Sequence, residues 1–214
     1  MKIFLLFISF SCIVFYSSAQ QKGVTESGDE VVLYDDGTWK YLNESSLEET
    51  DEIKINPTPY TKDSKSTFLV KSNKVNLGFY INPKKWSFKK AIQNPQAEYE
   101  FQLKGNDIYG MVITEGLEIP LESMVNIALE NGKKMSPDLK IINKEFRTVN
   151  GLKVLCMEMH GTMKGIKFGY YGYYYSSKEG TTQFITYSSK NIIVTQKKSC
   201  ESLLNGIVNI GDSK

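Results

Sequence analysis

The pattern of apolar and polar positions divides most of the chain into stretches with a strand-like period. Residues 97–103 alternate, with aromatic or aliphatic side chains on one side and Glu or Gln on the other. This alternation predicts a β-strand with one buried face. Further runs of β-prone residues predict strands at 67–71, 77–81, 108–114, 140–149, 152–162, 166–175 and 181–188. The pair Asn150-Gly151 predicts a tight hairpin turn between two of these strands.

Two stretches have the period of an amphipathic helix instead. The first apolar stripe consists of Leu121, Met124, Val125, Ala128 and Leu129, and the second of Cys200, Leu203, Leu204, Ile207 and Val208. Strands joined by short hairpins cannot all be parallel, because parallel neighbours need long crossovers. We therefore predict an α+β fold, in which one antiparallel sheet is covered by helices. Residues 152–162 carry apolar side chains in both registers, so this strand should be covered on both faces.

The region before this domain has a different character. Two β-prone runs, 31–34 and 38–42, flank Asp35-Asp36-Gly37, and Asp-Gly is a strong hairpin signal. The turn explains both aspartates without a bound cation. Residues 43–65 are polar and acidic, contain Pro57 and Pro59 and have no apolar period, as is typical of a linker. We expect a separate β-hairpin segment at 20–42, a linker at 43–65 and the α+β domain at 66–210.

The first residues resemble an export signal. Lys2 precedes an apolar run at 3–16, and small residues end at Ala19, which predicts cleavage between Ala19 and Gln20. The run is shorter than the roughly 20 residues of a membrane-spanning helix. Cys12 lies inside the run rather than at its end, which argues against a lipid-modified cysteine. We expect a periplasmic or extracellular protein that has no membrane span after cleavage of residues 1–19.

The order of these elements resembles that of the PsbP-like family over residues 65–210. The shared features are two strands, the segment Pro83-Lys84-Lys85-Trp86, two strands ending near Glu115, an amphipathic helix, Val149-Asn150-Gly151 inside a run of hairpins, and a terminal helix. The family includes the extrinsic photosystem subunit and DcrB-like bacterial envelope proteins. The resemblance implies an α/β/α sandwich around an antiparallel sheet. It also implies an accessory or binding role, with no catalytic residues to carry over.

Charge and residue counts exclude several classes of function. Lys and Arg number 26 against 24 acidic residues, whereas nucleic-acid affinity needs a clear basic excess. His160 is the sole histidine, and Cys156 lies four residues away on the same strand, about 13 Å by the strand rise. We therefore expect His160 to be a packing or strand-end residue. One His with Cys156 and Cys200 does not make a tetrahedral zinc site, and Glu115 and Glu118 suit the start of a helix.

The tyrosine-rich strand at 168–175 is the most unusual local feature. One face carries Phe168, Tyr170 and Tyr174, and the other carries Tyr171, Tyr173 and Tyr175. Such a ladder either binds sugar rings or a partner protein, together with Trp86, or packs beneath helices. We favour packing.

The two cysteines of the exported chain leave a second question open. Cys156 and Cys200 form a disulfide if their Cα atoms approach within roughly 7 Å, and otherwise remain buried thiols. The sequence does not fix this distance.

Together these features predict an exported, non-catalytic cell-envelope protein with a PsbP-like domain that binds a partner protein or an envelope component. The alternative is a small-ligand or glycan-binding module that uses the tyrosine-rich strand. An enzyme ranks third, because the usual nucleophile and acid–base sets are missing. We expect no cofactor and no metal.

Overall fold

The computed structural model describes residues 21–24, 30–34, 37, 39–41, 52–92 and 94–211. The chain divides into two compact units, Met1–Asp51 and Glu52–Lys214. The predicted signal peptide, with Ala19 and Gln20, lies outside the described residues, as do Asp35 and Asp36. No helix in the described part of the chain is long and apolar enough to cross a membrane.

The first unit contains a small antiparallel sheet in the order β1-β2-β3. Its strands are β1 (Gln21–Val24), β2 (Glu30–Leu33) and β3 (Trp39–Tyr41). β2 and β3 form the predicted hairpin, and Gly37 supplies a positive φ of 82° in the connection. β1 was not predicted from the sequence. A third strand is what an isolated hairpin needs for stability in water.

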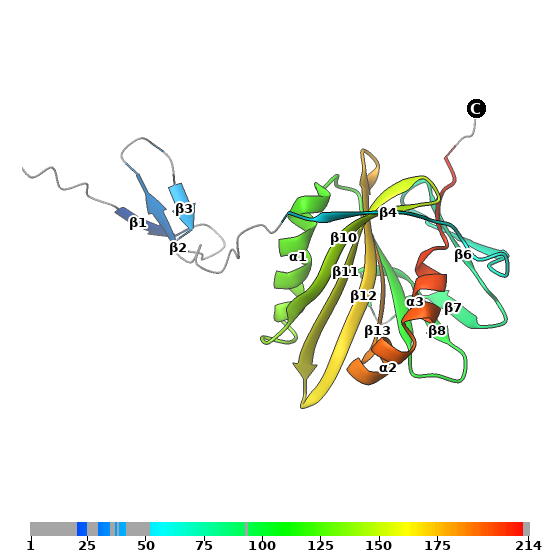
Figure 1. Ribbon diagram of the computed structural model, residues 1–214. Helices are drawn as coiled ribbons and strands as arrows, with labels where there is room; N and C mark the ends of the chain where they lie inside the picture. The colour runs from blue at the N-terminus through cyan, green and yellow to red at the C-terminus, as the bar shows by residue number, and fades with distance from the viewer. Residues whose placement is uncertain are drawn as a thin grey trace, which may run out of the picture. The chain divides into compact units, whose positions relative to one another are not determined.

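The second unit is built on an eight-stranded sheet in the order β4-β10-β11-β12-β13-β9-β8-β7 (Figure 1). Its neighbouring strands are antiparallel, except that β4 runs parallel to β10. The strands are β4 (Lys54–Tyr60), β7 (Trp86–Lys90), β8 (Ala97–Leu103), β9 (Tyr109–Glu115), β10 (Lys140–Val149), β11 (Leu152–Met163), β12 (Ile166–Ser177) and β13 (Gly180–Ser189). Asn150 and Gly151 both have positive φ, which confirms the predicted tight turn between β10 and β11.

Both faces of this sheet are covered, as predicted. One apolar cluster joins it to α1 (Leu121–Lys133). The other joins it to α2 (Lys190–Thr195), α3 (Lys197–Leu204) and a second sheet on the opposite face. That sheet has the order β14-β6-β5 and consists of β5 (Phe68–Lys71), β6 (Leu77–Ile81) and β14 (Ile207–Asn209). β11 buries Cys156 in one cluster and Met157 in the other, so it is the two-sided strand that its sequence indicates.

The structure corrects three details of the prediction. The strands at 68–71 and 77–81 leave the main sheet and form the smaller one. Part of the predicted 43–65 linker is strand β4, which lies at the sheet edge, where prolines are tolerated. The last helix ends at Leu204 rather than continuing through Val208. Two residues later, Gly206 lies so close to β6 that an added Cβ would meet the carbonyl oxygen of Tyr80.

Candidate functional site

The tyrosine-rich strand β12 lies in the centre of the sheet. Tyr171 and Tyr173 are 1% and 0% exposed, and Trp86 is 2% exposed. Tyr175 is partly buried against the same core. The predicted division of the strand into two faces is correct, since Phe168 and Tyr174 belong to the other core cluster. The side chains do not form an open binding surface, because α2, α3 and the small sheet cover that face. This applies to Tyr171, Tyr173, Tyr175 and Trp86.

Tyr171 and Tyr173 belong to a hydrogen-bonded network around the buried Arg147, which also includes α3. Arg147 of β10 donates from Nη1 to Tyr173 Oη at 3.0 Å and to Glu201 Oε1 of α3 at 2.9 Å. Tyr171 donates to the same Glu201 oxygen at 2.7 Å. Arg147 also pairs with Glu145, and its guanidinium lies 4.6 Å from the ring of Tyr60 on β4. The network therefore ties both α3 and the edge strand to the sheet.

The pKa shifts within this network follow from burial and hydrogen bonding. Burial acts to raise the pKa of Glu201, but the hydrogen bonds from Tyr171 and Arg147 outweigh it and hold the pKa below its ordinary value. Burial raises the pKa of both tyrosines. Glu201 is thus charged and the tyrosines are neutral at ordinary pH, which suits a structural ion pair.

Cys156 and Cys200 are buried free thiols and do not form a disulfide. Burial raises the pKa of Cys156 to about 11 and also raises that of Cys200. A thiol with such a pKa is almost fully protonated near neutral pH and is a poor nucleophile.

His160 is buried next to a carboxylate. Its Nε2 lies 2.9 Å from Glu158 Oε1, though outside hydrogen-bond geometry, and Lys197 of α3 donates to Glu158 Oε2 at 2.7 Å. His160 is 9% exposed, as expected of a packing residue. Among the described residues, no group of three or more His, Cys, Asp or Glu side chains gathers where a metal ion would bind.

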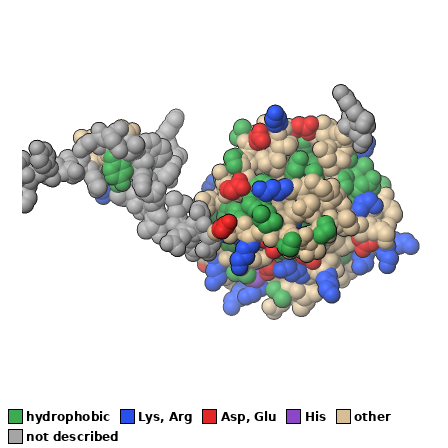
Figure 2. All heavy atoms as spheres, turned by 45° about the horizontal axis from the view of Figure 1, so that its top comes forward, with side chains coloured by type: hydrophobic (Ala, Val, Ile, Leu, Met, Phe, Trp, Pro, Cys, Tyr) green, Lys and Arg blue, Asp and Glu red, His purple; other side chains and the backbone are tan. Residues whose placement is uncertain are grey.

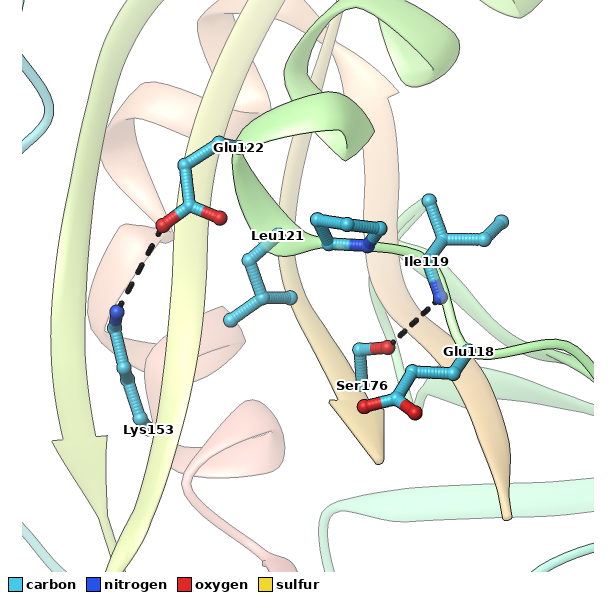
Figure 3. A pocket seen from close by; sticks show the side chains of 7 residues that line it. Glu118, Ile119, Leu121, Glu122, Lys153 and Ser176 are labelled. Carbon is cyan, nitrogen blue, oxygen red and sulfur yellow. Dashed lines mark hydrogen bonds and ion pairs between the residues drawn. The ribbon is translucent and has the colours of Figure 1, made fainter. Parts of the chain in front are cut away.

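A hollow near the start of α1 contains Glu118, Glu122, Lys153 and Ser176 (Figure 3). The amide of Ile119 donates to Ser176 Oγ at 3.1 Å and to Thr181 Oγ1 at 2.9 Å. Glu122 lies 3.9 Å from Lys153, and both side chains are more than half exposed. Ser176 and Thr181 thus hold the loop before α1. Two carboxylates beside the helix start also oppose an anionic ligand.

One exposed and two half-buried tyrosines lie beside the part of the sheet that α1 covers: Tyr109 is exposed, and Tyr170 and Tyr187 are half-buried. Tyr109 of β9 and Tyr187 of β13 stack with ring centroids 5.7 Å apart, and Tyr170 of β12 lies 6.0 Å from Tyr187. We call these three side chains the tyrosine surface. They are direct cross-strand neighbours, since Tyr187 pairs with both Tyr170 and Tyr109. Burial raises the pKa of Tyr170 and Tyr187, so both remain neutral donors.

A hollow of about 480 Å³ adjoins this surface. Its polar lining includes Ser87, Lys89, Glu100 and Gln102. Lys89 and Glu100 form an ion pair at 3.0 Å, in which the Lys89 side chain is 73% exposed. Sequence reasoning missed this site. Tyr109 and Tyr187 lie far apart in the chain, and only the strand order β12-β13-β9 brings them together.

The fold matches known structures although the sequence does not. No family model and no curated protein matches the chain. Among solved structures, the chain is similar to cyanobacterial PsbP from Synechocystis, with 15% identity, a TM-score of 0.51 and coverage of 69% of this chain and 94% of that one. The second unit therefore has the PsbP-like fold that the sequence resemblance implied. At this identity the similarity concerns the fold alone.

Two further similarities are looser. A protein of unknown function from Pseudomonas aeruginosa has 10% identity and a TM-score of 0.43, with 66% of this chain and 95% of that chain covered. LpqN, involved in cell envelope biogenesis of Mycobacterium tuberculosis, has 10% identity and a TM-score of 0.36, with 70% and 80% covered. Neither alignment is close enough to carry an argument.

Proposed function

We propose that this chain is an exported cell-envelope protein whose PsbP-like domain is a non-catalytic binding module, with the tyrosine surface as its contact face. Export is supported by the basic, apolar and small-residue pattern that ends at Ala19. The non-catalytic role is supported by the described titratable groups. Cys156 is a protonated buried thiol, and Glu201 is held by Arg147 in a structural pair.

The observation that carries the proposal is a pair of stacked rings on a part of the sheet that α1 leaves open. α1 packs on β11 and β12, whereas Tyr109 and Tyr187 lie on β9 and β13. Tyr109 is 37% exposed. A tyrosine ring supplies apolar contact area with one polar tip, and tyrosine is enriched in protein interfaces. The surface is therefore suited to a protein partner.

The test is a site-specific crosslink in the producing cell. A photoreactive benzoylphenylalanine at position 109 should give a discrete adduct with a partner after irradiation. Ile127 on α1 is the matched control position, because it is also 37% exposed. An absent adduct at 109, or the same adducts from both positions, would contradict the proposal.

A saccharide is the second candidate occupant of the same surface. The stacked rings of Tyr109 and Tyr187 adjoin the hollow that contains Glu100 and Gln102, whose side chains match sugar hydroxyl groups. Titration with cell-wall oligosaccharides should then change tyrosine fluorescence in a saturable way, and Tyr109→Ala should abolish that change. A flat titration in the unmodified protein would leave the protein partner as the sole proposal.

A further inference from the structure

One end of the main sheet collects lysines from many elements. β7, β9, β10 and β12 begin at this end, and β8, β11 and β13 end there, as the pairs Trp86–Leu103, Tyr109–Tyr187 and Lys140–His160 show. The loop after α1 is fixed to the same end, because the amide of Thr162 donates to Ser136 Oγ at 3.0 Å. We call this region the lysine end.

The lysines of this end come from the connections and from the strand and helix termini beside them. They are Lys84, Lys85, Lys104, Lys133, Lys134, Lys140, Lys164, Lys167 and Lys190. All except the half-buried Lys133 are exposed. Lys side chains are frequent along the lower edge of the domain in Figure 2. The end therefore carries a strong positive field.

Few carboxylates lie among these lysines. Glu130 pairs with Lys133 at 3.1 Å. Asp138 accepts from Ser136 Oγ at 2.7 Å and from the Thr162 amide at 2.8 Å, so it holds the loop after α1. Asp107 lies in the connection between β8 and β9. The positive charge of the end is thus only partly compensated.

Exposed apolar side chains project among the lysines. Met163 and Ile166 flank the turn Lys164-Gly165 at the tip of the β11–β12 hairpin and are 37% and 64% exposed. Lys164 and Gly165 have φ of 50° and 80°, the same left-handed pair as in the preceding hairpin turn. This tip is the lowest point of the domain in Figure 1. In the loop after α1, Met135 is 66% exposed.

We propose that the lysine end binds an anionic lipid surface, with Met163 and Ile166 entering the headgroup region. Lysines provide the attraction to negatively charged headgroups, and exposed aliphatic side chains add apolar burial that a purely polar polyanion would not reward. The attachment that we propose is peripheral, through side chains at the ends of strands and in their connections. This inference uses residues outside the tyrosine surface and goes beyond the proposed partner binding.

The experiment is a vesicle sedimentation assay with protein that starts at Gln20 and so keeps all the described strands and helices, from β1 onward. The protein should bind vesicles of phosphatidylcholine mixed with phosphatidylglycerol, and should bind pure phosphatidylcholine vesicles far more weakly. Added salt should release it, because the attraction is electrostatic. Equal binding to both kinds of vesicle, or binding to neither, would overturn the proposal.

Two triple variants with the same change in net charge provide the comparison. The test variant replaces lysines of the hairpin tip and the start of α2: Lys164→Gln, Lys167→Gln and Lys190→Gln. The control variant replaces exposed lysines away from this end: Lys54→Gln, Lys71→Gln and Lys178→Gln. Since each lysine near an anionic surface strengthens binding on the order of fivefold, the test variant should bind on the order of a hundredfold more weakly. The control variant should bind like the unmodified protein, and an equal loss in both would overturn the proposal.

The apolar part has its own test. Ile166→Ser should weaken binding to anionic vesicles without changing the net charge, and Ile127→Ser on α1 is its control. The triple lysine test variant should still give the crosslink at position 109. A failure of vesicle binding is therefore distinguishable from a failure of the partner proposal. Binding of Ile166→Ser that matches the unmodified protein would show that the side chain does not enter the headgroup region.

Discussion

Arg147 is the residue on which the packing of α3 and β4 converges. Its charge is largely buried, and Glu145 and Glu201 both pair with it. A buried ion pair is a weak source of stability by itself, but removing one partner leaves an uncompensated charge and commonly costs about 3–5 kcal/mol. The tyrosines of β12 complete the network, since Tyr173 accepts from Arg147 and donates to Asn205 at 2.9 Å.

Glu201 makes the stability of the domain depend on pH in a defined direction. Its pKa is depressed in the folded protein relative to an ordinary value of 4.5. Its contribution is therefore present above that value and is lost as the pH falls through the lower, folded-state pKa. We expect the thermal midpoint of Glu201→Gln to fall less steeply below about pH 4.5 than that of the unmodified protein.

Thermal unfolding followed by circular dichroism across this range measures the effect. Glu130→Gln is the control, because Glu130 makes an exposed i,i+3 pair with Lys133 on α1. Parallel pH curves for Glu201→Gln and the unmodified protein would show that Glu201 does not contribute in this way.

At the residue scale, the sequence predicted which side chains of β12 share a face. It left open whether those side chains are buried, although packing was the preferred interpretation. The period of two assigns Tyr171 and Tyr173 to one face without any tertiary information. Their burial depends on α3 and on Arg147, which come from parts of the chain outside β12. Tyr109 and Tyr187 could not be predicted as a site in this way. Neither stands out in the sequence, and only the strand order makes them neighbours.

At the element scale, three strands were predicted with their observed bounds, whereas the predicted bounds of β9, β11, β12 and β13 differ from the observed ones by one or two residues. The three strands are Leu77–Ile81, Ala97–Leu103 and Lys140–Val149. The strands that were missed lie at edges or are short. β7 buries Trp86 alone and exposes its other residues, so it shows no alternation. β14 is three residues long and lies within what resembles a helical stripe.

At the scale of the whole molecule, a net charge of +2 hides an uneven distribution. The near-equal numbers of basic and acidic residues argued against a polyanion-binding surface. A net charge summed over the chain does not show where the charges lie. Hairpin connections bring lysines from distant parts of the sequence to one end of the sheet. The extent of this separation depends on strand order, which the sequence pattern leaves undetermined.

The boundary of the main unit is also a property of the whole molecule, and it separates the sequence prediction from the structure. Sequence pattern placed the start of the domain at Ser66, whereas the compact unit begins at Glu52 and includes β4. β4 is attached by specific contacts. The Asn150 amide donates to the carbonyl oxygen of Tyr60 at 2.9 Å, and Asn56 donates to Glu145 at 3.2 Å.

Truncation tests which boundary is right. A chain that starts at Glu52 should unfold at the same temperature as the main unit in a chain that starts at Gln20. A chain that starts at Ser66 loses the Tyr60 and Asn56 contacts near Arg147, and we expect a cost of about 2–3 kcal/mol, or a midpoint lowered by roughly 6–9 °C. Circular dichroism melts of the three chains decide the matter. Equal midpoints for the two truncated chains would mean that β4 is dispensable, because its backbone pairing with β10 would then contribute nothing that water does not replace.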